Sequence, residues 1–160
     1  MRESAQAALS LLRGDAATFL PDLSLDGHDS NAWFAEHDIH LHVPAGAVPK
    51  DGPSAGVAML TALTSLLSGR PVRNDVAMTG EITLTGLVLP VGGLKEKSLA
   101  AQRAGIKRVI VPDRNEGEIL EIPRDELGGL EFIYVSEANE ALAAALEPGK
   151  AKRAGGTTSR

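Results

Sequence analysis

A stretch rich in glycine and proline, PKDGPSAG at residues 49–56, constrains this chain most strongly, because such a composition forces a shaped turn. An apolar run of helical length follows at residues 57–67 and ends before Gly69. Ser54 is therefore expected where a loop enters a buried helix, where free backbone N–H groups and the positive end of the helix dipole gather. A hydroxyl nucleophile there would find donors for the oxyanion that its attack creates. The alternative is that Ser54 is an ordinary helix N-cap.

The composition narrows the classes of protein to which the chain can belong. Its 160 residues suit a single domain, and with 43% hydrophobic but only 3% aromatic residues the core must consist of aliphatic side chains. The absence of cysteine excludes disulfides, thiolate metal sites and a cysteine nucleophile. A net charge of −5 argues against nucleic acid as the main partner. No apolar run approaches the length of a membrane span and no signal peptide opens the chain, so we expect a cytoplasmic location without membrane contact.

The first part of the chain predicts a helix at residues 3–12 and then a long polar connection at residues 15–38. Residues 39–44 alternate strictly, which predicts a strand with an apolar face and a second face that carries His40 and His42. Two such histidines could ligate a metal, but no further ligands follow with suitable spacing, so a polar face near a site is favoured.

The rest of the chain predicts a mixed α/β fold. Strands are expected at 75–79 and 81–84, the second forming a hairpin with 87–90, followed by a helix at 94–104. Then come a strand at 106–111, a helix at 115–122, a strand at 130–135 and a helix that Ser136 caps and that ends at Leu146. This βαβα order predicts parallel pairing in the C-terminal half of a mixed sheet. We expect one domain over residues 1–147 and a disordered, apolar-poor tail at 148–160.

Lys97 lies on the apolar face of the predicted helix at 94–104. At about 100° per residue it falls inside an arc of apolar and small residues, whereas Lys95 lies on the solvated side. The arc consists of Leu94, Ser98, Ala100, Ala101 and Ala104. A lysine in that place can extend its amine to solvent, pair with a carboxylate, or stay neutral. A neutral amine can take the proton of a serine hydroxyl, so Lys97 and Ser54 are candidates for a Ser–Lys dyad.

Three motifs in this chain together resemble the proteolytic domain of the Lon proteases, in particular the bacterial, ATP-dependent A-type. They are PKDGPSAG at 49–56, MTGEIT at 78–83 and GGLKEK at 92–97, and the resemblance is collinear from residue 1 to about residue 148. It implies a mixed α/β fold specific to this family, assembled as a hexameric ring. It also implies that Ser54 is the nucleophile and that Lys97, rather than Lys95, is the general base.

The resemblance gives supporting roles to further residues. Thr79 matches a threonine that holds the lysine amine, and Asp51 matches a loop acid that can open or block the site. His40 and His42 match strand histidines that support the site. The oxyanion donors are expected among the backbone N–H groups from Gly52 through Pro53 to Ser54, of which proline has none. From the residues alone, Thr79 could equally be a β-branched strand residue and Asp51 an N-cap.

The chain also departs from a complete protein of this family. We expect an N-terminal substrate-binding region, an ATPase module and the first strands of the domain to be missing from it. Residues 92–95 lack the Gly-x-x-x-x-Gly-Lys spacing of a phosphate-binding loop. We therefore expect no cofactor and no metal in this chain, with ATP and Mg²⁺ bound only by the missing module.

The leading hypothesis is a serine endopeptidase with a Ser–Lys dyad, the protease part of an ATP-dependent machine that degrades unfolded or damaged proteins. Its expected partners are unfolded protein substrates, a Lon-type ATPase module and further copies in a homo-hexamer. The alternative is a catalytically silent assembly or binding fragment of such a protease. A nucleotide-binding module has only the glycine content in its favour.

Overall fold

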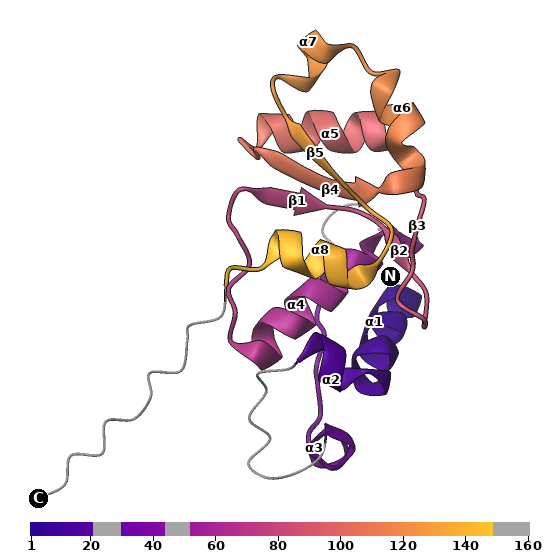
Figure 1. Cartoon of the computed structure of the whole chain (residues 1–160), viewed down its shortest axis with the longest axis vertical. Coiled ribbons are helices and arrows are strands. Elements are labelled where there is room, and N and C mark those ends of the chain that lie inside the picture. Colours follow the sequence, from indigo (N-terminus) through magenta and orange to yellow (C-terminus); the bar gives the residue numbers. More distant parts are fainter. Residues whose placement is uncertain (21–29, 44–51, 149–160) are drawn as a thin grey trace, which may run out of the picture.

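A computed structural model describes residues 1–20, 30–43 and 52–148. Helices and strands alternate along most of this part of the chain (Figure 1). The N-terminal elements are α1 (Arg2–Gly14), α2 (Ala16–Phe19), α3 (Ser30–Glu36), the 3₁₀ turn η1 (Pro53–Ala55) and α4 (Gly56–Ser68). They are followed by β1 (Val76–Met78), β2 (Glu81–Ile82), β3 (Val88–Leu89), α5 (Leu94–Arg103), β4 (Arg108–Pro112) and the 3₁₀ turn η2 (Asp113–Asn115). The last elements are α6 (Glu116–Leu120), α7 (Arg124–Leu127), β5 (Glu131–Val135) and α8 (Ala138–Ala145).

A three-stranded parallel sheet in the order β1-β4-β5 forms the centre of the fold. Val76 pairs with Arg108, and Arg108 also pairs with Glu131, so both neighbours of β4 run in its direction. Parallel strands need crossover connections, and here α5 links β1 to β4 through the hairpin while α6 and α7 link β4 to β5. The predicted parallel pairing of the C-terminal half is confirmed, whereas α7 was not predicted.

The central strand β4 separates two hydrophobic clusters. Ile110 contributes to the cluster that α1, α4 and α8 share, whereas Val109 and Val111 contribute to the cluster under α5, α6 and α7. Figure 1 shows the two groups of helices on opposite sides of the sheet. Because successive side chains of a strand point to opposite faces, a strand buried on both faces must be apolar at consecutive positions. This accounts for the run of aliphatic residues in β4.

The hairpin of β2 and β3 forms a separate two-stranded antiparallel sheet, with Glu81 opposite Leu89. The hairpin prediction is confirmed, but among the described strands the hairpin does not join the parallel sheet to form the mixed sheet that we expected. The reason lies at Gly80, whose N–H donates to the carbonyl of Ser54 and whose carbonyl accepts from the N–H of Val57. These backbone groups pair with the turn η1 and with the first turn of α4, so the ladder of β1 does not continue into β2.

The predicted strand at residues 39–44 is wrong over the residues that the structure describes there, 39–43, which are assigned to no strand. The alternation itself is present, because Ile39 and Leu41 pack against the core and His40 and His42 are exposed. An extended segment becomes a strand only when a neighbour accepts its hydrogen bonds. Within the described part of the chain, the paired strands are β1 to β5, and none of them pairs with this segment.

Two smaller predictions also need correction. The connection at 15–38 contains the helices α2 and α3, and Phe19 and Phe34 from it are buried in the core. The N-cap of α8 is Glu137 rather than Ser136, and it forms a capping box with Glu140. The predicted division into a domain at 1–147 and a tail stays a prediction, because residues 149–160 lie outside the described residues. Within the described ranges, no helix has the length and apolar character needed to cross a bilayer.

Candidate active site

Ser54 lies in the 3₁₀ turn η1, directly before α4. Gly52 precedes the turn with a φ of 139°, and Pro53 follows at its first position, where the absence of a backbone N–H costs nothing. The N-caps of η1 and α4 are Gly52 and Ala55, and neither end has a side-chain cap. Ser54 therefore does not act as the N-cap of either helix, and its partly buried side chain is left for another role.

Two glycines let the Ser54 turn lie against the β1–β2 connection. The carbonyl of Ser54 accepts from the N–H of Gly80 at 3.0 Å. A Cβ added at Gly56 would lie 2.9 Å from the backbone nitrogen of Ile82, and one added at Gly80 would lie 2.8 Å from Cγ2 of Val57. Since real Cβ atoms do not approach other atoms this closely, both positions need glycine. The glycines of the motifs thus permit a close contact between two backbone segments.

The amine of Lys97 lies next to Thr79. It donates to Oγ1 of Thr79 at 3.2 Å and to the carbonyl of Gly92 at 2.9 Å. Oγ1 of Thr79 in turn donates to the carbonyl of Ser54 at 3.3 Å. Thr79 is buried and lies just after β1, so it links the turn of Ser54 to the helix of Lys97. The structure thus brings Ser54, Thr79 and Lys97 together from three separate motifs.

The environment of Lys97 makes its ammonium group easier to deprotonate than that of an ordinary lysine. Burial lowers the pKa of Lys97, because the charged form loses hydration, and the nearby negative charge of Glu118 opposes this shift by raising it. A partly buried amine with a lowered pKa is neutral, and able to accept a proton, at a lower pH than an ordinary lysine. Lys95, in contrast, is exposed and pairs with Glu126 at 2.8 Å.

The apolar arc of α5 is narrower than the sequence predicts. Leu94, Ser98 and Ala101 are buried, but Ala100 and Ala104 are exposed. Only residues within a short arc of such a helix can contact the sheet and α6 at once, and Ala104 lies beyond the end of α5 at its C-cap. Lys97 lies at the border of this arc. Its side chain is half-buried, and its amine reaches Thr79.

The remaining predicted site residues are not joined to this group. His40 and His42 are exposed, with roughly parallel rings whose centroids are 6.4 Å apart, and no hydrogen bond between described residues connects them to Ser54 or Lys97. Asp51 lies outside the described residues, so its predicted role remains a prediction, as does that of the oxyanion donors. Among the described side chains, no group of three or more His, Asp or Glu residues is arranged to hold a metal ion.

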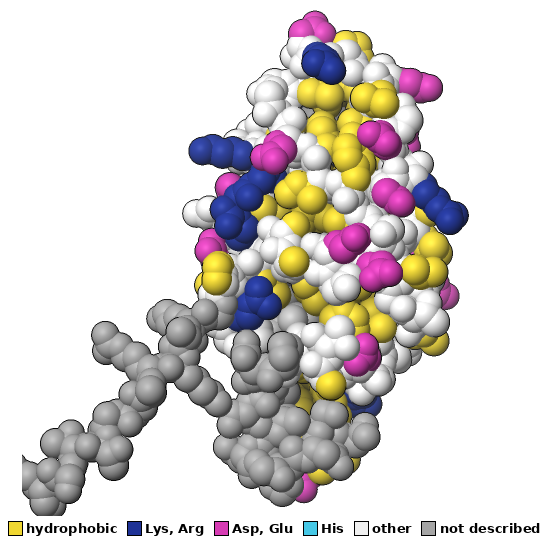
Figure 2. Space-filling view, in the orientation of Figure 1, with side chains coloured by type: hydrophobic (Ala, Val, Ile, Leu, Met, Phe, Trp, Pro, Cys, Tyr) yellow, Lys and Arg dark blue, Asp and Glu magenta, His cyan; other side chains and the backbone are white. Residues whose placement is uncertain are grey.

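A cavity lies away from Ser54, Thr79 and Lys97. It measures about 280 Å³ and is lined mainly by apolar side chains of α6, α7 and β5, with Ile119, Leu127 and Phe132 among them. Figure 2 shows hydrophobic side chains gathered over this upper part of the molecule. None of the predicted site residues lines this cavity, so it is not part of the candidate active site. That site is identified by the hydrogen bonds among Ser54, Thr79 and Lys97.

Sequence reasoning missed Asn115 and Glu118, which contact the segment before α5. Glu118 accepts from the N–H of Leu94 at 3.1 Å, and Asn115 bonds to both backbone groups of Val91 at 2.9 Å. Asn115 ends the turn η2 as the N-cap of α6, and Glu118 lies three residues further on in α6, a spacing that places two residues on the same side of a helical segment. Nothing in the sequence, however, indicates that this face meets residues 91–94.

The comparisons with known proteins place this α/β domain among the serine peptidases. A family model described as the Lon protease (S16) C-terminal proteolytic domain matches residues 1–148. The chain belongs to this family, which supplies the peptidase part of Lon proteases.

Individual relatives agree with this assignment. A Lon protease of Anaeromyxobacter dehalogenans is 57% identical over 147 residues, which cover 92% of this chain and 16% of the relative. The Lon protease 4 of Sorangium cellulosum is 54% identical over 160 residues, covering 99% of this chain and 19% of the relative. The peroxisomal Lon protease homolog 2 of Danio rerio is 56% identical over 150 residues, covering 93% and 17%. The chain thus spans less than a fifth of the length of these relatives.

Proposed function

We propose that this chain is a serine endopeptidase domain in which Ser54 is the nucleophile and Lys97 the general base. The observation that carries the proposal is the hydrogen-bonded link from the Lys97 amine through Thr79 to the turn of Ser54. The lowered pKa of Lys97, caused by burial, supports it further. Membership of a serine peptidase family makes peptide-bond hydrolysis the expected reaction.

The proposed reaction follows from the chemistry of the two groups. The hydroxyl oxygen of Ser54 attacks the carbonyl carbon of the substrate, and its proton passes to the neutral amine of Lys97. The tetrahedral intermediate collapses to an ester on Ser54, and the leaving amine takes the proton from the Lys97 ammonium. Water then attacks the ester while Lys97 again accepts a proton, and this proton passes to the hydroxyl oxygen of Ser54 as the acid product leaves. Thr79 keeps the amine oriented through its hydrogen bond.

The wider role is proposed from the family. The substrates are unfolded or damaged proteins, delivered by a Lon-type ATPase module that binds ATP and Mg²⁺, and the working assembly is a homo-hexamer. The domain itself needs no cofactor, because the nucleophile and the base are both side chains. A cytoplasmic location fits the bacterial relatives, whereas the relative from Danio rerio is described as peroxisomal.

The nucleophile can be tested with a fluorogenic peptide and a serine-directed covalent reagent. We expect label on Ser54 and loss of peptide cleavage in Ser54→Ala, with unfolding temperature unchanged, because one hydroxyl oxygen is removed and little volume changes. Ser10→Ala, at an exposed position in α1, is the matched control and should keep full activity. Retention of more than a few percent of activity in folded Ser54→Ala would remove Ser54 from this role. Absence of both label and cleavage in the unmodified chain would favour the silent assembly module.

A further inference from the structure

Asn115 holds the backbone of Val91 through both of its polar groups. The N–H of Val91 donates to Oδ1 of Asn115, and Nδ2 of Asn115 donates to the carbonyl of Val91, each at 2.9 Å. The asparagine side chain thus pairs with a single residue as a neighbouring strand would. Asn115 is only 7% exposed, and without it both backbone groups of the half-buried Val91 would lose this partner.

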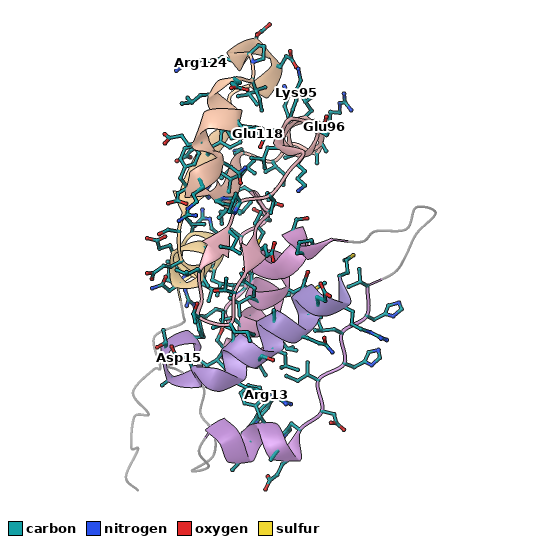
Figure 3. All side chains as sticks on the ribbon, turned by 90° about the vertical axis from the view of Figure 1, so that its right-hand side faces the viewer. Arg13, Asp15, Lys95, Glu96, Glu118 and Arg124 are labelled. Carbon is teal, nitrogen blue, oxygen red and sulfur yellow. The ribbon has the colours of Figure 1, made fainter. Side chains whose placement is uncertain are left out.

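Glu118 supplies the cap that α5 lacks locally. The residue before α5 is Gly93, which has no side chain to cap the free N–H groups of the first turn. Oε1 of Glu118 accepts from the N–H of Leu94 at 3.1 Å, and Oε2 accepts from Nδ2 of Asn115 at 3.2 Å. Figure 3 shows Glu118 on the side of α6 that faces the beginning of α5, where Lys95 and Glu96 also lie. A carboxylate at a helix N-terminus also interacts favourably with the helix dipole.

The segment held in this way, residues 91–94, carries one of the two acceptors of the Lys97 amine. Nζ of Lys97 donates to the carbonyl of Gly92 at 2.9 Å, and the N–H of Lys97 donates to the carbonyl of Gly93 at 3.2 Å. Gly93 adopts a left-handed backbone with a φ of 72°, which makes the segment a sharp turn. The two side chains from η2 and α6 thus fix both ends of the turn whose middle binds the amine.

We propose that Asn115 and Glu118 are positioning residues of the peptidase site, which hold the turn at residues 91–94 and thereby keep the amine of Lys97 against Thr79. The proposal rests on the proposed function, since it assigns Lys97 the role of base. Neither residue needs to contact the substrate. They act by orienting the Lys97 amine, and the rate of proton transfer depends steeply on the distance and angle between the base and the hydroxyl.

Glu118 also acts on the protonation of Lys97. Its negative charge raises the pKa of Lys97 and so opposes the effect of burial. The other charged groups at this end of α5 are engaged elsewhere or exposed, because Lys95 pairs with Glu126 of α7 and Glu96 faces solvent. Replacing Glu118 with glutamine should therefore lower the pKa of Lys97 further, an effect that a purely structural role in the fold would not produce.

The test compares Glu118→Gln, Glu118→Asp and Asn115→Ala with the unmodified chain and with Glu121→Gln. Glu121 is an exposed carboxylate just after α6 and provides the same change in charge. The readouts are kcat and KM for a fluorogenic peptide as functions of pH. Independently of activity, the Lys97 amine is titrated by NMR with ¹³C-labelled lysine, its signal assigned with Lys97→Met. Thermal unfolding of each variant reports whether it is folded.

In Glu118→Gln we expect the midpoint of the pH profile and the NMR titration of Lys97 to move together to lower pH. The limiting kcat should fall about tenfold, with KM within about twofold, because the base is displaced while substrate contacts remain. Asn115→Ala should lower kcat similarly with a smaller change of midpoint. Glu118→Asp should keep the midpoint and recover part of kcat, and Glu121→Gln should match the unmodified chain.

Unchanged kcat and an unchanged Lys97 titration in folded Glu118→Gln would overturn the proposal, as would a loss confined to KM. If Asn115→Ala does not fold, the two Glu118 variants decide the question alone. Failure of the proposed function is recognised separately. In that case Ser54→Ala keeps its activity or the unmodified chain shows none, while the NMR titration of Lys97 still shows whether Glu118 acts on the amine.

Discussion

At the scale of single residues, Lys97 is the position where opposing effects meet. Burial lowers its pKa and the charge of Glu118 raises it, and the first effect is the larger. Its amine has two acceptors, Thr79 and Gly92, so it is oriented as well as desolvated. Lys95, two residues before it, is exposed, and its amine pairs with Glu126 on the surface, away from Ser54 and Thr79. The two lysines of one motif therefore differ in the chemistry that they can perform.

Lys97→Arg should reduce peptide cleavage by at least about 100-fold although it keeps a positive charge. A guanidinium does not give up its proton at any working pH, so it cannot act as a base. Lys95→Arg is the matched control and should stay within about twofold of the unmodified chain, since arginine can also pair with Glu126. Steady-state kinetics of both folded variants check this. The reversed pattern of activities would mean that Lys95 is the base.

The rate of cleavage should rise with pH through the titration of Lys97. Only the neutral amine accepts a proton, so activity is lost below its pKa and gained above it. Because burial lowers this pKa, the rise should lie at lower pH than for an ordinary lysine. The measurement is kcat/KM against pH for the unmodified chain and for the double variant His40→Ala, His42→Ala. Loss of the rise in the double variant would assign the base to a histidine.

At the scale of elements, the site depends on the contact between the Ser54 turn with α4 and the connection from β1 to β2. Gly80 exchanges hydrogen bonds with Ser54 and Val57, and Thr79 adds its hydroxyl to the same carbonyl of Ser54. Such a contact requires two backbones to approach without side chains between them. Gly56 meets this requirement toward the backbone of Gly80 and Ile82, and Gly80 leaves room for the side chains of Val57 and Val88.

Gly80→Ala should destabilise the fold by about 1–3 kcal/mol and impair cleavage, because the new methyl group would lie 2.8 Å from Val57 and 2.9 Å from Val88. Gly14→Ala is the control, since nothing lies within 4 Å of its added Cβ. It should leave stability unchanged or slightly increased. Denaturant unfolding and peptide turnover of both variants provide the measurement. Equal stability of the two variants would contradict the close contact.

At the scale of the whole molecule, the sheet divides the described chain into two hydrophobic clusters, and the candidate site spans them. Ser54 is attached to α4, whose side chains join one cluster, whereas Lys97 is on α5, which packs in the other. The sheet and its hairpin connect the two through Thr79 and Gly80. The site therefore forms only when α4 and α5 are both packed against their own faces of the sheet.

We expect this chain by itself to hydrolyse short peptides, to leave folded proteins intact and to show no response to ATP. The reason is that its sequence contains no phosphate-binding loop with which to couple nucleotide hydrolysis to unfolding. Peptide and casein turnover with and without ATP, alongside sedimentation, test this, with a full-length relative as the positive control. Stimulation of this chain alone by ATP would contradict the expectation.

The local features of the chain could be predicted from its sequence, because each depends on residues close together. The helix before Gly69, the hairpin of β2 and β3, and the placement of Lys97 rather than Lys95 toward the apolar side of its helix follow from periodicity and turn residues. The three motifs also suffice to recognise the family. Periodicity alone, however, could not show that Ser54, Thr79 and Lys97 meet.

Only the tertiary structure decided which partners these local features have. Residues 39–43 alternate as a strand would but are paired with none of the described strands, since pairing depends on a neighbour remote in sequence. Asn115 and Glu118 contact residues 91–94 because α6 packs beside α5, about 24 residues away along the chain. Hydrogen-bond partners at such separations are set by packing around the two clusters, and no local pattern of residues encodes them.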